Sequence, residues 1–300
     1  MKILVTGANG LLGQKLTSLL AKDNTTTLIA TARSAPSIPM PEGSFYHLDI
    51  TDADEVNKVI SVHKPEVIIN TAAMTQVDDC EKDHEACWNA NVRAVEHLIS
   101  ACHRNNVHLV HVSTDFIFDG TQELLDETAI PNPVNFYGKS KLAGEQRIME
   151  SSISWCILRT VLVYGVTDDM SRSNIVLWVK KNLEQGKTIQ VVNDQWRTPT
   201  LAEDLADGCF LAARKKATGI FNICGKDYLS VYDIALRTAE CFGLDKGLIK
   251  ETDSTKFSQP AARPMRTGFI IEKARRVLGY EPHSLEEGLS IVASQLSSQS

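Results

Sequence analysis

The chain has 300 residues, which is long enough to bury a large core in one α/β domain, alone or with a smaller partner domain. Its net charge of −6 argues against a nucleic-acid surface, although a local basic pocket is compatible with it. No stretch approaches the roughly 20 apolar residues of a membrane span, and the run after Met1 is too short for a signal peptide, so we expect a cytoplasmic protein without a membrane partner.

A glycine turn follows the first predicted strand, residues 2–6, and leads into an amphipathic helix. Its spacing is G-x-x-G-x-x-G, which differs from the G-x-G-x-x-G of the usual dinucleotide fingerprint. Glycines between a strand and a helix permit a tight turn, and the helix N-terminus offers free N–H groups to a pyrophosphate. We therefore expect a dinucleotide cofactor to be bound by Gly7, Asn9, Gly10, Leu11, Leu12 and Gly13.

The second predicted strand, residues 27–31, ends near Arg33. An NAD-selective site would carry an acidic residue there for the ribose 2′-hydroxyl, and none is present. The planar, permanently charged fork of Arg33 suits the 2′-phosphate of NADP instead, although a solvated surface arginine is the alternative. The sequence favours NADP(H) and leaves NAD(H) open.

Strands and helices then alternate, which predicts a doubly wound parallel sheet of the α/β class. The run 45–48 leads into Asp49 and Ile50, which we place against an adenine, although Asp49 could also be a turn residue. A helix over 52–63, a strand over 67–70 and a long helix over 83–104 follow. Ala72 and Ala73, directly after the strand, are small enough to let a cofactor cross the strand ends.

Ser113 and Thr114 come directly after the next strand, 109–112, and ligands bind at such strand ends in parallel sheets. Tyr137 and Lys141 stand four residues apart in a predicted helix, so one helical turn brings them together. A nearby ammonium favours the phenolate and so lowers the pKa of a phenol. Tyr137 is therefore a candidate general acid.

With the glycine turn, the loop 113–120 and this pair in order, the chain resembles the extended short-chain dehydrogenase/reductase family over nearly its whole length. The resemblance implies a Rossmann fold and a catalytic set of Thr114, Tyr137 and Lys141. Tyr137 would protonate a carbonyl, Thr114 would polarise it, and Lys141 would hold the ribose hydroxyls and lower the pKa of the tyrosine. Ser113 is the rival for the role of Thr114.

Segments 113–120, 137–145, 192–200 and 262–264 are similar to the dTDP-4-dehydrorhamnose reductase branch of that family. This similarity implies NADPH-dependent reduction of the 4-keto group of a nucleotide-linked deoxysugar, as in dTDP-rhamnose biosynthesis. Related dehydratases typically carry a glutamate where this chain has Phe116, so dehydration is not expected. Arg197 replaces a glycine usual in the branch, and Met265 also departs from its pattern.

We assign residues 1–163 to a dinucleotide-binding domain and 164–300 to a smaller substrate-binding region, partly interleaved with the first. In the second half we expect a strand at 188–192 and at 219–223, and helices over 175–185, 201–213 and 231–242, the last capped by Ser230. The predicted substrate-binding residues are Thr75, Asp115, Phe116, Asn174, Trp196, Arg197 and Arg263. Arg172 and Arg266 are further cations for a diphosphate, and for each arginine a surface ion pair is the alternative.

Two other functions stay open at this point. One is a nucleotide-sugar epimerase with tightly bound NAD. The other is a non-catalytic NADP-binding regulatory subunit, similar to the beta subunit of methionine adenosyltransferase. Seven cysteines without C-x-x-C spacing, and histidines without ligand spacing, favour reduced thiols and predict no metal site. A homodimer is compatible with the sequence.

Overall fold

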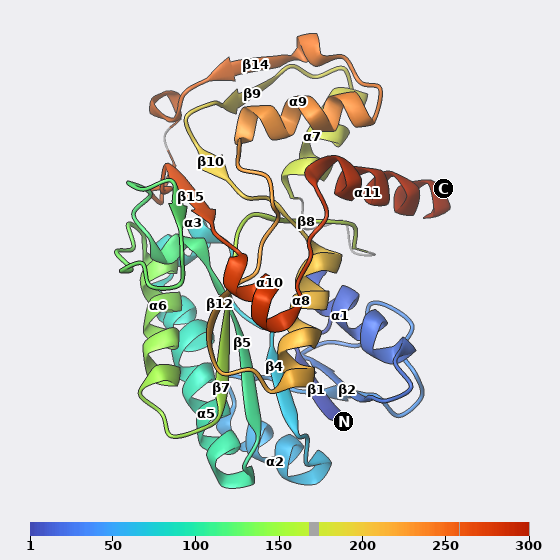
Figure 1. The fold of residues 1–300 in the computed structure, drawn as a ribbon, viewed down its shortest axis with the longest axis vertical. Helices are drawn as coiled ribbons and strands as arrows, with labels where there is room; N and C mark the ends of the chain where they lie inside the picture. The colour runs from blue at the N-terminus through green and yellow to red at the C-terminus, as the bar shows by residue number, and fades with distance from the viewer. Residues whose placement is uncertain (168–173, 258, 300) are drawn as a thin grey trace.

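A computed structural model describes residues 1–167, 174–257 and 259–299 of the chain, so Arg172 lies outside the described residues. Its central feature is a seven-stranded sheet, in the spatial order β12-β7-β5-β4-β1-β2-β3 (Figure 1). All pairs in this sheet are parallel. The strands are β1 Lys2–Thr6, β2 Thr27–Ala32, β3 Phe45–His47, β4 Val67–Asn70, β5 His108–Thr114, β7 Trp155–Thr160 and β12 Gly219–Asn222. The predicted doubly wound α/β fold is confirmed.

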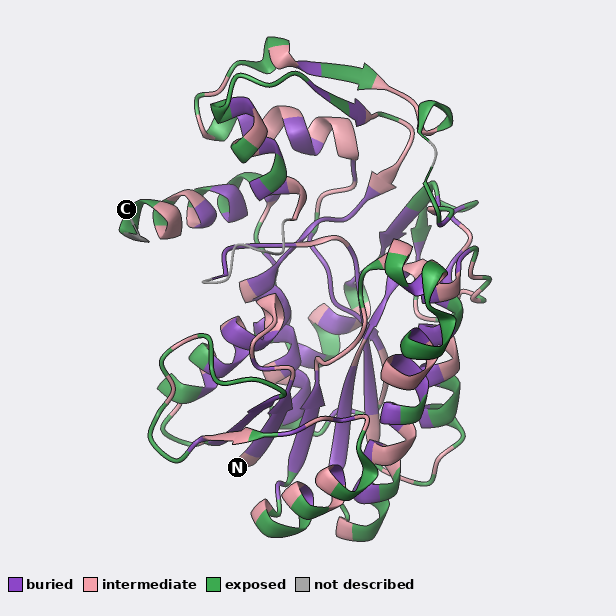
Figure 2. Cartoon of the chain, turned by 180° about the vertical axis from the view of Figure 1, so that it is seen from behind, coloured by how far each residue is buried: buried purple, intermediate pink, exposed green. Residues whose placement is uncertain are grey.

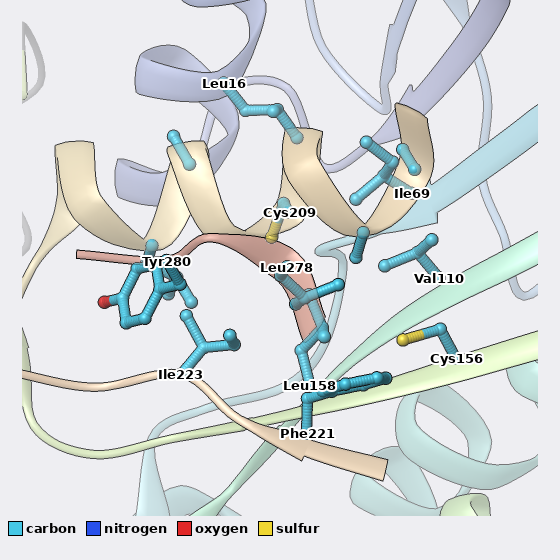
Figure 3. Packing of buried hydrophobic residues seen from close by; sticks show 14 of the residues in the cluster. Leu16, Ile69, Val110, Cys156, Leu158, Cys209, Phe221, Ile223, Leu278 and Tyr280 are labelled. Atoms are coloured by element: carbon cyan, nitrogen blue, oxygen red, sulfur yellow. The ribbon is translucent and has the colours of Figure 1, made fainter. Parts of the chain in front are cut away.

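Helices cover both faces of this sheet, which is why its central strands are buried along nearly their whole length (Figure 2). On one face, α1 Leu11–Lys22, α8 Ala202–Lys215 and α10 Glu272–Leu278 share a core with the strands. Figure 3 shows this core, with Leu16 of α1 and Cys209 of α8 packed above Val110 and Leu158 of the sheet. The other face packs against α2 Ala53–His63, α5 Ala94–Asn105 and α6 Phe136–Met149.

The long helix predicted over 83–104 is confirmed at 84–105, with one π-helical turn inside it. The chain forms α3 Val77–Lys82 and α4 His84–Trp88, and then a π-helical turn, Asn89–Arg93, joins α4 to α5. A π-turn accommodates an extra residue and redirects the side chains within it. Here it directs the Asn91 amide to the Met74 carbonyl oxygen, at 3.0 Å, and to Ser140 Oγ on α6, at 2.9 Å.

A second lobe lies above the carboxyl ends of the central strands (Figure 1). Its helices are α7 Ile175–Glu184, α9 Val231–Cys241 and α11 Leu285–Gln299. As predicted, Ser230 caps α9 through a reciprocal bond with Asp233. Three small sheets complete the lobe: β9 Ile189–Val192 with β14 Ile249–Thr252; β8 Val163–Tyr164 with β11 Thr200–Leu201; and β13 Leu229–Ser230, β10 Trp196–Arg197, β15 Arg266–Phe269 and β6 Leu124–Leu125 in that order.

The two halves of the chain exchange elements. β12 and α8 come from the second half, yet β12 is the edge strand beside β7 and α8 packs on α1. Conversely, β6 from the first half pairs with β15. The division of the chain into two domains near residue 163 stays a prediction. These exchanged elements are where the two halves interleave.

The described cysteines are all free thiols, and only Cys241 among them is exposed. Among the described residues no helix combines the length and the apolar character that crossing a membrane would require.

Candidate active site

The glycine turn is shaped by close backbone contacts. Gly7 has a positive φ of 70°, and a Cβ on Gly13 would lie 2.1 Å from the Gly7 carbonyl oxygen, so neither position tolerates a side chain. Gly10 precedes α1 in an extended conformation, without a side-chain cap, and the first turn of α1 contains no acidic residue. The N–H groups of the first turn of α1 and the positive end of its dipole are therefore available, and the glycine turn fits a pyrophosphate.

Asn9 ties this turn to the loop after β2. Its Nδ2 donates to the Ala35 carbonyl oxygen, at 2.9 Å, and to Ser34 Oγ, at 3.0 Å, while its Oδ1 accepts from the Ser37 N–H, at 3.1 Å. Arg33, at the start of the same loop, is exposed. The loop next to Arg33 is thus held in a defined position beside the glycine turn, where a 2′-phosphate would need it.

The predicted adenine neighbours lie at the adjacent strand ends. Burial raises the pKa of Asp49, but the backbone and hydroxyl of Thr51, followed by the charge of Arg33, outweigh it and hold that pKa below its usual value. The Thr51 N–H and hydroxyl lie 2.9 and 2.7 Å from Asp49 Oδ1, so Asp49 is also the turn residue of the alternative interpretation. Ile50 is buried, while Ala72 and Ala73 are half-buried after β4.

Tyr137 lies in the first turn of α6, which begins where Asn135 Oδ1 accepts the Gly138 N–H at 2.8 Å. The ring of Phe116 meets the Tyr137 ring edge-on, with centroids 5.7 Å apart. A Cβ on Gly138 would lie 2.1 Å from the Phe116 carbonyl oxygen, so a glycine is needed for α6 to approach this loop. These contacts place the phenol at the carboxyl end of β5.

Burial raises the pKa of Tyr137 well above its usual value, and neighbouring Asp115 adds to this, whereas a hydrogen bond with Thr114 opposes it. The sequence predicts that Lys141 lowers this pKa, whereas the net direction in the structure is a rise. The physical reason is that desolvation of the phenolate outweighs its favourable contacts.

Lys141 is buried one turn further along α6. Its Nζ donates to the Val112 carbonyl oxygen, at 2.8 Å, and lies 3.3 Å from His111 Nε2. Burial lowers the pKa of Lys141 to about 8, while Glu145 and Cys87 act in the opposite direction. The ammonium is thus present at neutral pH and is lost just above it.

The hydroxyl that interacts with Tyr137 is that of Thr114. Ser113 points the other way, because successive side chains of a strand alternate, and its Oγ is buried without a partner among the described residues. Thr114 Oγ1 donates to Asp115 Oδ1 at 3.1 Å. Burial raises the pKa of Asp115, whereas Arg197 and the Thr267 hydroxyl lower it without reversing the rise. The Arg197 Nε lies 3.9 Å from Asp115 Oδ2, and the Thr267 hydroxyl donates to the same oxygen.

Two of the predicted substrate cations are engaged by the protein itself. The buried Arg197 guanidinium donates to the carbonyl oxygens of Trp196 and Pro264, each at 2.7 Å. Arg263 forms a two-pronged ion pair with Asp78, at 2.6 and 2.9 Å. Both arginines therefore hold segments of the second lobe in place beside the site. Arg266 pairs with Glu123 at the surface, at 2.8 Å.

The remaining predicted substrate residues lie further apart. Trp196 is half-buried, with its ring 5.4 Å from that of Tyr228. Asn174 caps α7 and donates to the Gly165 carbonyl oxygen at 2.8 Å, and Thr75 is exposed between β4 and α3. The structure thus brings together Thr114, Asp115, Phe116 and Tyr137, with Arg197 beside Asp115 and with Lys141 on the same helix as Tyr137, bonded to β5.

Sequence reasoning missed three residues that support this cluster, namely Asn70, His111 and Asn91. His111 contacts Lys141, Asn70 contacts His111, and Asn91 bonds Ser140 Oγ on α6. The available signal was a polar residue within an otherwise apolar strand: Asn70 ends the run 67–70, and His111 interrupts the run 109–112. A buried polar residue needs a hydrogen-bond partner, so each of these positions indicated a buried polar contact.

The family described as RmlD substrate binding domain matches residues 1–298. A dTDP-4-dehydrorhamnose reductase from Aggregatibacter actinomycetemcomitans is 31% identical, over 96% of this chain and 97% of its own. The crystal structure of dTDP-4-dehydrorhamnose reductase from Bacillus anthracis in complex with NADP is 28% identical, covers 98% of this chain and 99% of its own, and has a TM-score of 0.84.

A different kind of relative is also found. Methionine adenosyltransferase 2 subunit beta from Mus musculus is 29% identical, over 84% of this chain and 76% of its own.

Proposed function

The chain belongs to the RmlD substrate binding domain family, and from this premise we propose that it transfers a hydride from NADPH to the 4-keto group of a nucleotide-linked deoxysugar, with Tyr137 as general acid. Membership places it among the NAD(P)-dependent sugar-nucleotide reductases. The observation that carries the finer proposal is the convergence of Thr114, Tyr137 and Lys141 at the carboxyl end of β5.

NADP(H) is the cofactor that the site fits, and it supplies the hydride when bound. The free N–H groups at the start of α1 would bind its pyrophosphate, and Arg33 would pair with its 2′-phosphate. The relative from Bacillus anthracis, solved in complex with NADP, supports this choice. An epimerase with tightly bound NAD is disfavoured because no acidic residue follows β2 at the position of Arg33.

The high pKa of Tyr137 keeps its phenol protonated until a carbonyl oxygen gains negative charge. At that moment the phenolic O–H would pass its proton to the oxygen, and the Lys141 ammonium one turn away would stabilise the phenolate left behind. Thr114 donates to Asp115 in this structure, so it polarises the carbonyl only after its hydroxyl turns away from that carboxylate.

The test is NADPH oxidation across a panel of nucleotide-linked 4-keto sugars. We expect turnover with at least one of them, and a loss of about a thousandfold in kcat for Tyr137→Phe with NADPH affinity retained. Tyr232→Phe, on α9 of the second lobe, is the matched control and should keep full activity.

Unchanged turnover in Tyr137→Phe would refute the assignment of the general acid. Absence of ketone-dependent oxidation, together with a co-purifying enzyme whose activity responds to this chain, would instead favour a regulatory role, which the beta subunit relative makes the second candidate.

A further inference from the structure

A row of buried polar side chains crosses the centre of the sheet. Thr6, Asn70 and His111 are register partners on β1, β4 and β5, which are neighbours in the sheet. Thr6 Oγ1 donates to Asn70 Oδ1 at 2.6 Å, Asn70 Nδ2 lies 3.0 Å from His111 Nδ1, and His111 Nε2 lies 3.3 Å from Lys141 Nζ. The row therefore runs from the residue before Gly7 to the lysine of the site.

These residues are as inaccessible as any in the core. Thr6 is 0%, Asn70 1%, His111 1% and Lys141 3% exposed. Burying an imidazole and an amide is unfavourable unless each finds a partner, and apolar side chains would fill the same space without that cost. Each side chain in this row contacts the next, and at its end Lys141 also donates to the Val112 carbonyl oxygen.

We propose that His111 is a positioning residue, which is held by Asn70, fixes Lys141 Nζ beside the Val112 carbonyl oxygen, and changes tautomer when Lys141 changes charge. The proposal rests on the proposed function for its catalytic meaning. Its structural content concerns only Lys141, His111 and Asn70.

In the structure Asn70 Nδ2 faces Nδ1, so the proton of a neutral imidazole sits on Nε2, where an unprotonated Lys141 amine can accept it. A charged ammonium has no lone pair and needs Nε2 as an acceptor. The imidazole proton then sits on Nδ1, and Asn70 turns its amide oxygen toward it. The two forms differ by one proton, which is released to solvent.

Burial and the charge of Lys141 hold the pKa of His111 well below its usual value, so the imidazole stays neutral in both forms. Other charges reach Lys141 from Glu145 on its own helix and Cys87 on α4. Tyr137 lies one turn away on α6. Further titratable or charged groups on elements packed against α6 include Asp115 after β5, Cys80 on α3, Glu96 on α5 and Arg159 on β7, the last paired with Glu145.

The first experiment reads the tautomer directly and needs no substrate. In ¹⁵N NMR spectra of the full chain labelled with ¹⁵N-histidine, the His111 proton should move from Nδ1 to Nε2 as pH rises through about 8, where Lys141 loses its charge. This movement should vanish in Lys141→Met. Buried His108 on the same strand, bonded to Ser154, is the internal control and should not respond to that variant. A His111 that titrates as a free imidazole would overturn the proposal.

The second experiment is the pH profile of kcat/KM for NADPH oxidation. Activity requires the charged lysine, so it falls as pH rises through the Lys141 pKa. His111→Leu removes an acceptor of the ammonium and should move this alkaline limb down by about one pH unit. His111→Asn, whose amide oxygen can still accept, should restore most of it, and Asn70→Leu should give an intermediate shift.

His108→Leu is the matched variant, because it removes an equally buried histidine from β5 without touching Lys141. It should leave the alkaline limb in place. If both histidine variants lower kcat equally and neither moves the alkaline limb of the pH profile, His111 has only a packing role. If no sugar is reduced at all, the proposed function fails while the tautomer experiment still decides the role of His111.

Discussion

Arg33 is the exposed side chain that we expect to choose between the two nicotinamide cofactors. Its loop is fixed to the glycine turn by Asn9, so its guanidinium does not have to order a mobile segment before it meets a phosphate. An arginine fork pairs with phosphate oxygens by two parallel hydrogen bonds, a geometry that lysine lacks. Selectivity between the two nicotinamide cofactors should therefore reside largely in this residue.

We predict that Arg33→Ala raises KM for NADPH by about tenfold to a hundredfold, the usual range for losing charge-assisted hydrogen bonds. KM for NADH should change little, because NADH has no 2′-phosphate. The KM of Arg33→Lys for NADPH should lie between those of the parent chain and Arg33→Ala, since lysine keeps the charge and lacks the planar fork. Steady-state kinetics with each cofactor measures the effect, and parallel losses with both cofactors would contradict it.

Among the elements, α6 bears the proposed general acid Tyr137 near its N-terminus, and this N-terminus is held from two sides. Asn135 accepts the Gly138 N–H, at 2.8 Å, and donates to the Ala262 carbonyl oxygen of the second lobe, at 2.7 Å. The same side chain thus caps the helix that bears Tyr137 and joins that helix to the lobe predicted to bind substrate.

Asn135→Ala should lower the free energy of unfolding by about 1 kcal/mol, the usual contribution of an N-cap. It should also lower kcat, because the first turn of α6 positions Tyr137. Ser230→Ala, which removes the cap of α9, is the control: urea unfolding should show a similar loss of stability, while kcat is retained. Equal kcat in both variants would mean that the cap serves stability alone.

Elements with a strong periodic signal could be predicted from the sequence, and short ones could not. The central strands and the helix capped by Ser230 are confirmed within a few residues, and Tyr137 and Lys141 lie on a helix as predicted. β8, β10, β11 and β13 have two residues each, too few to show any alternation, and they form only because distant partners pair with them.

The candidate site divides in the same way. Gly7, Thr114, Tyr137 and Lys141 belong to local motifs, whose spacing is visible in the chain. Arg197 and Arg263 read as free cations, because their partners, the Pro264 carbonyl oxygen and Asp78, come together only through the tertiary fold. Asn70 and His111 stand out as polar residues in apolar runs, but their pairing with each other and with Lys141 could not be predicted, since the members of the row are more than 25 residues apart along the chain.

For the molecule as a whole, two buried histidines make stability depend on pH. Burial lowers the pKa of His108 to about 4 and that of His111 well below its usual value of 6.5. Below pH 6.5 the unfolded chain binds protons at these positions, whereas the folded chain does not. Stability is thus fully present above the unfolded pKa and is lost as pH falls toward the folded pKa.

We predict that the free energy of unfolding, measured with urea, falls between pH 6.5 and 4, with about 2 kcal/mol of the loss due to His108. In His108→Asn, which cannot take up this proton, the decline over the same range should be smaller by that amount. An identical pH dependence in the variant and the parent chain would show that His108 is protonated in the fold or titrates normally.

The position of β12 has a consequence for how the protein is made. β7 ends at Thr160, but its outer neighbour β12 is not complete until Asn222 has been synthesised. During vectorial synthesis, the nascent chain therefore exposes one edge of a nearly finished parallel sheet while some sixty further residues leave the ribosome. An open, apolar strand edge is a template for pairing with another chain. Ribosome pausing after the first half should thus favour aggregation over folding.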